Sequence, residues 1–588
     1  MKFAKSFNKE PFIEVKDKEK ECFAGWESIS REVKKFSGEN PSVRRIIIVE
    51  TYQGVLLDDL KEQIKNHIQP DILLDTLDAF KEEESIREMT CSDVTDDRVF
   101  GYMTRLNMMD FLDKEKLAQM QMKVADVKDS MVVIFGYGAS LVWDKPDVMI
   151  YADMARWEIQ RRMRQNLVNN LGINNRTESA ELKYKRGFFV DWRVCDRLKK
   201  KTAHKWDYVL DTNDENRPKL VSSDAIMEGI RKAAHQPFSV VPFFDPGPWG
   251  GQWMKDNFDL NREEENYAWC FNCVPEENSL LLKFGETKLE IPAINVVFFQ
   301  TLNLLGPAVH GRFGDEFPIR FDFLDTMDGG NLSLQVHPLT EYIQETFGMH
   351  YTQDESYYLM DAEADASVYL GLKEGVDREK MEKELRIAEK EGSPFDPSLY
   401  VENWPAKKHD HFLIPAGTIH CSGKNSMVLE ISATPYIFTF KLYDWGRKNL
   451  DGKPRPINVD HGLKNIQWDR TSGWTSENLL PKVEKIAEGE GWTEEKTGLH
   501  EREFIETRRH WFTGSVSHNT NNGVNVITLV EGEEIVVESP ENSFEPFHVH
   551  YAETFIVPAA VGKYTIRPSG PSVGKKCATV KAFVRSNA

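Results

Sequence analysis

Apolar and polar positions alternate in blocks over the first 240 residues. Three continuous apolar runs are typical of strands buried on both faces: residues 45–49, 130–135 and 148–151. Helical patterns follow over residues 56–67 and 155–166, and the apolar run 187–191 predicts a fourth strand. Strands separated by helices predict an α/β domain with a parallel sheet over residues 1–240.

The pattern changes near residue 241, just before the turn-rich stretch 245–251. Short strands separated by turns are predicted beyond it, over residues 279–284, 289–291, 331–337, 356–360, 367–370, 412–414, 427–432 and 437–443. A helical insertion interrupts them within about residues 371–395, with Asp377 as its cap and Gly392 as its end. The chain is thus predicted to be multidomain, with an all-β domain over 241–450 and a linker with a second β domain over 451–588.

Charge and apolar run length narrow the class of protein. The 588 residues include 94 acidic and 74 basic side chains, a net charge of −20, which gives no global attraction for nucleic acid or an anionic membrane. No apolar run approaches the roughly 18 residues of a membrane span. Because the N-terminus lacks a signal pattern and the seven cysteines are widely spaced, we expect a large cytoplasmic protein.

Two metal-ligand types occur together on the predicted strand around residue 335. Gln335 and His337 are two residues apart, so their side chains point the same way, and Ser333 joins that face. A lone Gln-x-His pair is a weak signal for a metal site. Its weight depends on whether other segments supply further ligands.

Two later segments supply them. Glu355 opens a strand 18 residues after His337. The stretch Ile-Pro-Ala-Gly-Thr-Ile-His then places a tight turn before His420, at the start of another strand. Two imidazoles and a carboxylate suit zinc with an open position, and the Gln335 amide adds a fourth, harder ligand.

These motifs resemble type I mannose-6-phosphate isomerase, a cupin family. The resemblance covers roughly residue 246 to the C-terminus and rests on residues 249–251, 332–338, 355, 415–420, 428–431, 442–447 and 555–559. It implies jelly-roll domains and one zinc ion per chain, bound by Gln335, His337, Glu355 and His420. It also implies a catalytic Arg447 and a substrate-binding Ser333. Lys441, on the same predicted strand as Tyr443, is a candidate substrate-binding residue that adds charge near the phosphate, with a solvated surface lysine as the alternative.

The implied reaction interconverts mannose 6-phosphate and fructose 6-phosphate through an enediol. Zinc can act as a Lewis acid on the sugar oxygens, and the Arg447 guanidinium can stabilise the enediolate or hold phosphate. One departure matters: the family has a lysine two residues before its glutamate ligand, and this chain has Gln353. The loss of that lysine either lowers activity, shifts the substrate or is compensated elsewhere, and Lys407 and Lys408 are candidates for this by their proximity to a ligand loop. The alternative function is a non-catalytic, metal-bearing sugar-phosphate binding or regulatory protein.

The first 240 residues loosely resemble uridine kinase-like nucleoside kinases. The resemblance rests on residues 132–138 and 147–151 and on the arginines at 156, 161, 162 and 164. Residues 50–56 stand where a P-loop would, but contain one glycine and no lysine, so we predict a degenerate domain without kinase activity and doubt nucleotide binding. The arginines and Lys199–Lys201 either hold a phosphate or form a solvated helix face.

The remaining histidines receive simpler interpretations. His409 and His411 flank Asp410 and are predicted to be solvated turn residues. His548, His550 and Glu553 resemble a second ligand set, but no Pro-x-Gly-x-x-His segment follows them. A second metal site is therefore not expected.

Overall fold

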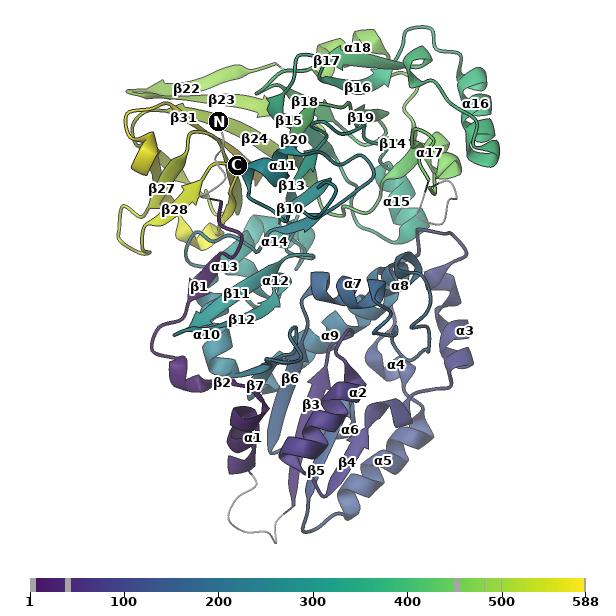
Figure 1. Cartoon of the computed structure of the whole chain (residues 1–588), viewed down its shortest axis with the longest axis vertical. Helices are drawn as coiled ribbons and strands as arrows, with labels where there is room; N and C mark the ends of the chain where they lie inside the picture. Colours follow the sequence, from purple (N-terminus) through teal and green to yellow (C-terminus); the bar gives the residue numbers. More distant parts are fainter. Residues whose placement is uncertain (1–6, 37–43, 449–454, 481, 499, 586–588) are drawn as a thin grey trace. The chain divides into compact units, whose positions relative to one another are not determined.

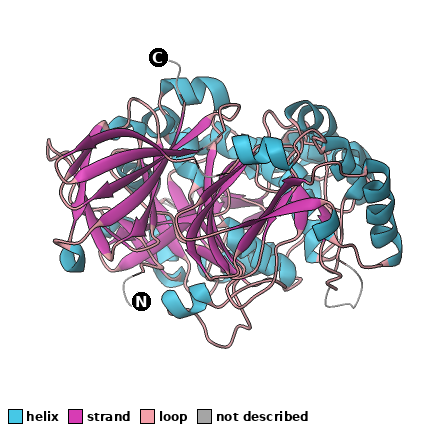
Figure 2. Ribbon diagram, turned by 90° about the horizontal axis from the view of Figure 1, so that it is seen from above, coloured by secondary structure: helices cyan, strands magenta, loops and turns pink. Residues whose placement is uncertain are grey.

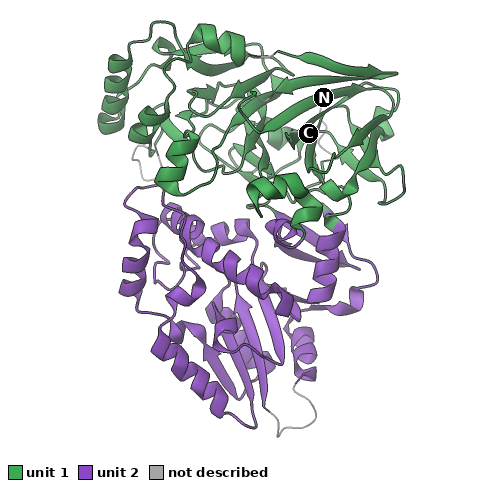
Figure 3. Ribbon diagram, turned by 180° about the vertical axis from the view of Figure 1, so that it is seen from behind, with its two compact units in different colours: residues 1–11, 233–278, 300–588 green, residues 12–232, 279–299 purple. Residues whose placement is uncertain are grey.

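The structure is a computed structural model that describes residues 7–36, 44–448, 455–480, 482–498 and 500–585. The chain forms two compact units, each built from segments that are separated in the sequence (Figure 3). One unit contains residues 12–232 and 279–299, and the other contains residues 1–11, 233–278 and 300–588. The predicted limits at residues 240 and 450 remain predictions. Among the described residues, none of the helices has the length and apolar character that crossing a membrane requires.

A seven-stranded sheet forms the centre of the unit that contains residues 12–232 (Figure 1). Its strands are β2 (Cys22–Ala24), β3 (Arg45–Thr51), β4 (Ile72–Asp75), β5 (Met131–Gly136), β6 (Val148–Asp153), β7 (Tyr208–Asp211) and β8 (Lys219–Ser222). Their order is β2-β8-β7-β6-β3-β5-β4, and the five strands from β7 to β4 are parallel. The predicted α/β domain with a parallel sheet is therefore confirmed in outline.

Helices connect these strands. The longer ones are α1 (Trp26–Lys35), α2 (Leu57–Gln63), α3 (Glu83–Val94), α5 (Lys114–Asp126), α7 (Arg156–Arg164), α8 (Ala180–Arg186), α9 (Trp192–Thr202) and α10 (Ser223–Ala233). The strand predicted at residues 187–191 is wrong: Gly187–Asp191 is a π-helical turn between α8 and α9. All five residues are buried, and periodicity alone does not separate a buried strand from a buried helix.

A hairpin predicted for the β-rich part lies in this first unit instead. It consists of β11 (Ser279–Phe284) and β12 (Thr287–Pro292), and β11 pairs in parallel with β1 (Phe12–Glu14). The short helix α12 (Ile294–Phe299) follows. Strand pairing with a segment more than 260 residues away in the chain cannot be read from a local pattern.

The second unit is built mainly of antiparallel strands (Figures 1 and 2). One sheet has the order β18-β15-β20-β13-β10-β9, with β9 (Phe243–Asp245), β10 (Trp269–Cys273), β13 (Ile319–Asp325), β15 (Glu355–Ala362), β18 (His411–Ile414) and β20 (Ser426–Ala433). The other has the order β17-β16-β19-β14-β21, with β14 (Leu334–Val336), β16 (Ser367–Leu372), β17 (Val401–Pro405), β19 (His420–Ser422) and β21 (Phe440–Tyr443). The predicted all-β architecture is confirmed here.

The predicted helical insertion is α16 (Arg378–Glu391). The Asp377 carboxylate accepts a hydrogen bond from the backbone amide of Lys380, and Gly392 ends the helix with a φ of 68°. Met381, Leu385 and Ala388 form its buried face. Other helices of this unit are α11 (Trp253–Asn257), α13 (Thr301–Leu305), α14 (Pro307–Phe313), α15 (Thr340–Phe347), α17 (Val459–Asn465) and α18 (Ser472–Asn478).

Two further sheets form the C-terminal part. One has the order β22-β23-β24-β31-β26-β29, with β22 (Glu484–Gly489), β23 (Trp492–Gly498), β24 (Ile505–Phe512), β26 (Asn525–Glu531), β29 (Thr554–Val557) and β31 (Cys577–Val584). The other has the order β25-β30-β27-β28, with β25 (Val516–Asn519), β27 (Glu534–Glu538), β28 (Phe547–His550) and β30 (Lys563–Pro568). Residues of both sheets share one apolar core that includes Ile527, Leu529, Val537 and Ile566.

Candidate metal centre

Three candidate ligands, two imidazoles and one carboxylate, converge between the two sheets of the first β part. His337 follows β14, His420 opens β19, and Glu355 opens β15 of the other sheet. The Nε2 atoms of His337 and His420 lie 3.0 Å and 2.7 Å from the two oxygens of the Glu355 carboxylate. All three side chains are buried, and their ligand atoms lie within 4.8 Å of one another. This His/Glu/His cluster forms from the segments that the sequence indicated.

Hydrogen bonds fix how both imidazoles face the carboxylate. His337 Nδ1 lies 2.9 Å from the carbonyl oxygen of Phe438, and His420 Nδ1 lies 2.8 Å from that of Thr418. A carbonyl oxygen only accepts, so each Nδ1 carries a proton and each Nε2 is the ring nitrogen available to a metal ion. Two imidazole nitrogens and a carboxylate that meet at one buried point are ligands typical of a divalent metal ion. The donor set therefore fits a divalent metal ion.

The charges of the cluster agree with this geometry. Burial alone raises the pKa of the Glu355 carboxyl, but the His337 and His420 imidazoles hold that pKa well below its usual range. The side-chain amide of Gln335 completes the group, because its Nε2 lies 3.2 Å from His420 Nε2. A half-turn of the amide would bring its oxygen, a ligand atom, to that position.

The turn before His420 is held from two sides. Gly417 has a φ of 85°, and its backbone amide donates to the carbonyl oxygen of His337 at 3.0 Å. Asp354 accepts from the amide of Ala416 at 2.7 Å, and the Arg470 guanidinium donates to the carbonyl oxygens of Pro415 and Ala416 at 2.9 Å and 2.8 Å. Sequence reasoning missed Asp354 and Arg470. Asp354 is signalled only by its position next to Glu355, and Arg470 by nothing local.

A cavity of about 190 Å³ opens beside the cluster. It is lined by Trp249, Trp269, Phe271, Arg320, Leu324, Leu332, Ser333, Gln335, Gln353, Glu430, Tyr436, Thr439 and Lys441. Both predicted substrate-binding residues, Ser333 and Lys441, are among them. Burial lowers the pKa of Lys441 to about 8, and the Arg455 charge acts in the same direction.

Arg447 is not among the described residues that line this cavity. Its guanidinium donates to the Asp444 carboxylate at 3.0 Å and to the carbonyl oxygen of Asn331 at 2.5 Å. The Ser333 hydroxyl donates to the same Asp444 carboxylate at 2.8 Å. Arg447 thus reaches the cavity only through Asp444 and Ser333, and its predicted catalytic role remains a prediction.

The position of the missing lysine is filled by a neutral side chain. The Gln353 amide lines the cavity, and its Nε2 lies 3.3 Å from a Glu355 oxygen. Neither Lys407 nor Lys408 lines the cavity. Lys408 instead pairs with Glu531 at 2.6 Å.

His411 differs from its predicted role as a solvated turn residue. It lies on β18, is buried, and its Nε2 lies 2.9 Å from the Ser356 hydroxyl. Burial, with the nearby Arg509 charge, lowers the pKa of His411 to about 3. An unfolded histidine titrates near 6.5, so below that pH the unfolded chain binds the extra proton and the folded chain does not.

His411→Gln therefore tests a stability effect in mild acid. We expect the wild-type protein to lose about 1.4 kcal/mol of unfolding free energy per pH unit relative to the variant as pH falls from about 6 to 5. Urea unfolding of both proteins at the two pH values measures it. A stability difference that does not change with pH would contradict the assigned burial.

His548, His550 and Glu553, which resemble a second ligand set in the sequence, do not meet at one point. His548 pairs with Glu534 at 3.0 Å and His550 with Glu553 at 3.1 Å, and His548 is exposed. Among the described residues, only the His/Glu/His cluster brings three histidine, cysteine or carboxylate ligands close enough to hold one metal ion.

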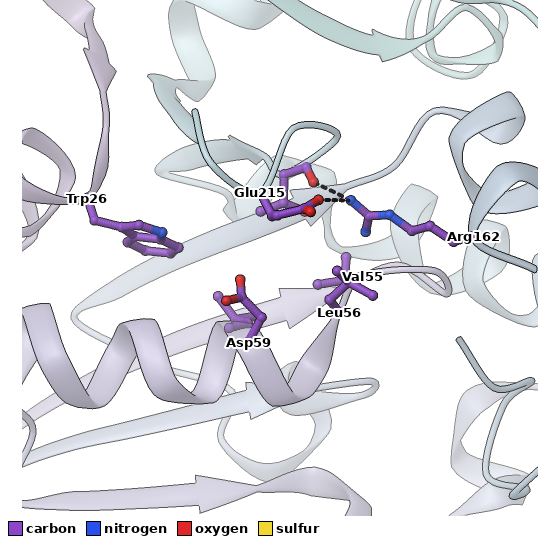
Figure 4. Close-up of a pocket in the computed structure, with 8 residues that line it drawn as sticks. Trp26, Val55, Leu56, Asp59, Arg162 and Glu215 are labelled. Atoms are coloured by element: carbon purple, nitrogen blue, oxygen red, sulfur yellow. Dashed lines mark hydrogen bonds and ion pairs between the residues drawn. The ribbon is translucent and has the colours of Figure 1, made fainter. Parts of the chain in front are cut away.

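In the other unit, the loop between β3 and α2 lies where a P-loop would. Gln53 is buried there, donating to the carbonyl oxygen of Asn169 and accepting from the Trp192 indole. Beside this loop a cavity of about 10 Å³ remains, the space of roughly one water molecule. Arg162 borders it and pairs with Glu215 at 3.7 Å (Figure 4). The kinase-like interpretation stays a prediction.

Three of the seven basic residues singled out in this unit are buried, namely Arg156, Arg162 and Lys199, whereas Arg161, Arg164 and Lys201 are exposed. Arg162 is buried, bonded to Glu158 and to the carbonyl oxygens of Gly54 and Thr212. Lys199 is also buried and pairs with Asp153 at 2.7 Å. The alternative of a solvated helix face is therefore wrong for Arg156, Arg162 and Lys199.

Comparisons with known proteins cover both parts of the chain. Residues 25–235 match a family described as "Domain of unknown function (DUF8485)". The mannose-6-phosphate isomerase ManA of Bacillus subtilis is 26% identical over 236 residues, 40% of this chain and 68% of that protein. The mannose-6-phosphate isomerase of Streptococcus mutans is 28% identical over 217 residues, 37% of this chain and 63% of that protein.

Among solved structures, the mannose 6-phosphate isomerase of Bacillus subtilis has a TM-score of 0.48 and 19% identity, covering 59% of this chain and all of that one. The sequence relatives support an isomerase. Over about 40% of its length, the chain is a homologue of the mannose-6-phosphate isomerases.

Proposed function

We propose that this protein is a zinc-dependent aldose–ketose isomerase that interconverts mannose 6-phosphate and fructose 6-phosphate. The observation that carries the proposal is the convergence of His337, Glu355 and His420 beside a cavity that polar and apolar side chains line together. His337, Glu355, His420 and Gln335 would hold the metal ion. When bound, the ion supplies a Lewis acid for the carbonyl and hydroxyl oxygens of the sugar.

The chain's own side chains would bind and orient the substrate. Ser333 and Lys441 line the cavity, where a hydroxyl and a half-buried ammonium can hydrogen-bond the sugar and its phosphate. The buried walls limit the access of water, which strengthens these interactions. The proton then moves between C1 and C2 of the sugar through an enediol.

A second candidate is a sugar-phosphate binding protein without turnover. The observation that favours it is Gln353, which puts a neutral amide beside Glu355 where the family carries a lysine. This candidate predicts saturable binding of mannose 6-phosphate with no conversion.

One experiment separates the two candidates. Purified protein is assayed for conversion of mannose 6-phosphate to fructose 6-phosphate as isolated, after chelation, and after zinc is returned. The isomerase predicts activity that chelation removes and zinc restores. Zinc-loaded protein that binds the sugar phosphate without converting it would overturn the isomerase and leave the binding protein.

Lys441 gives the proposed isomerase a distinctive pH dependence. Its pKa is lowered to about 8 by burial, so the ammonium loses its charge as pH rises through that value. We expect kcat/KM to fall on the alkaline side with a midpoint near pH 8, and Lys441→Arg to move this midpoint upward by at least about one unit, because arginine stays charged. An identical alkaline limb in both proteins would exclude Lys441 as its origin.

A further inference from the structure

A row of polar residues crosses the six-stranded sheet on the cavity side. Glu355 on β15 lies opposite Ser432 on β20, and Ser432 lies opposite Arg320 on β13. Residues in direct register share one face of a sheet. The row therefore begins at the His/Glu/His cluster and ends at a guanidinium.

The facing sheet carries a matching row. His420 on β19 lies opposite Gln335 on β14, and Gln335 lies opposite Lys441 on β21. This row also begins at the cluster and ends at a cation. Neighbouring strands lie about 4.8 Å apart, so the backbone of each terminal cation lies about 10 Å from that of its row's first residue.

The Arg320 side chain is buried but only partly bonded. Its Nη2 donates to the Asp322 carboxylate at 2.9 Å and lies 3.1 Å from a Glu430 oxygen. Its Nε and Nη1 have no hydrogen-bond partner within the described part of the chain, although the side chain lines the cavity. Buried guanidinium donors are costly to leave unpaired, so a ligand that accepts from them would be stabilised.

We propose that Arg320 is a second cationic binding residue of this cavity, which donates from Nη1 to the anionic group of a phosphorylated sugar. The sugar's carbonyl end would then lie at the His/Glu/His cluster. The proposal rests on the proposed function and adds the residue that recognises the phosphate together with Lys441. The guanidinium stays positively charged and so attracts an anionic phosphate, which the neutral Gln353 amide cannot do.

The test removes Arg320 without leaving its nearest carboxylate unpaired. The double variant Arg320→Gln, Asp322→Asn is compared with Arg508→Gln, which removes a guanidinium also held by two carboxylates, Glu494 and Glu506, in the C-terminal sheets. Calorimetry on the zinc-loaded full chain measures the Kd of mannose 6-phosphate, and inorganic phosphate is titrated as a second probe. We expect both affinities to fall about ten- to hundredfold in the double variant and to stay unchanged in the control.

Zinc content and thermal unfolding establish that the variants are folded. If the double variant does not fold, Arg320→Lys replaces it, because lysine keeps a charge beside Asp322 but lacks the Nη1 donor of the guanidinium, and the same direction of change is expected. Folded, zinc-loaded variants that bind both probes like the wild type would overturn the proposal.

The outcome for the proposed function is read separately. Wild-type protein that binds mannose 6-phosphate through Arg320 without converting it would overturn the isomerase and leave the Arg320 proposal standing. If the double variant converts mannose 6-phosphate as fast as the wild type, the isomerase would stand and the Arg320 proposal would be overturned. Wild-type protein that binds neither probe would overturn both.

Discussion

We expect His420→Ala to lower the rate of mannose 6-phosphate isomerisation at least about a thousandfold, because the metal's contribution to the transition state is several kcal/mol. The substitution removes one of three buried ligands that meet at 2.7–3.0 Å. It also leaves Glu355 buried with a single imidazole. Zinc content by atomic spectroscopy should fall together with kcat.

The matched control is His548→Ala. That histidine is exposed and paired with Glu534 on the C-terminal sheets, away from the ligand cluster. Its loss should leave zinc content and kcat within about twofold of the wild type. A His420→Ala protein that keeps both its zinc and its turnover would show that the cluster is not the reactive centre.

Gly417→Ala is expected to damage the same site through the backbone. Gly417 has a φ of 85°, where a side chain costs roughly 1–2 kcal/mol. An added Cβ would also lie 2.7 Å from Gln467 Cγ and 2.9 Å from the carbonyl oxygen of Asn465. Because the turn carries His420, we expect the zinc affinity to fall at least about tenfold, and competition with a chelator of known affinity measures it.

Gly375→Ala is the control for Gly417→Ala, because it strains the backbone in the same way without crowding neighbouring atoms. Gly375 has a φ of 69°, but no atom lies within 4 Å of an added Cβ. This control should lower the unfolding midpoint slightly and leave zinc affinity unchanged. Equal effects of both substitutions on zinc affinity would mean that the turn does not position His420.

The sequence predicts those parts of the site that depend on local spacing. Gln335 and His337 share a strand face because side chains alternate, and the Pro-Ala-Gly turn leads directly to His420. The cap and buried face of α16 follow from Asp377 and from helical spacing. Each of these features needs only a few neighbouring residues to specify it.

Features that depend on strand register could not be predicted. Arg320 lies in one row with Glu355 only because β20 separates β13 from β15, and no local pattern contains that order. The burial of His411 likewise follows from the neighbours of β18 in the sheet. The run Gly187–Asp191 is buried on all sides, so its apolar pattern fits a strand as well as the observed helical turn.

The most direct test of the account is a zinc titration of the metal-free protein with turnover of mannose 6-phosphate as the readout. The account predicts activity that rises linearly and stops at one zinc per chain, with no rise for a Glu355→Gln variant. Glu355 is the carboxylate that both imidazoles face, so this variant removes the centre of the cluster. Full occupancy without turnover, or equal turnover by the variant, would contradict the account.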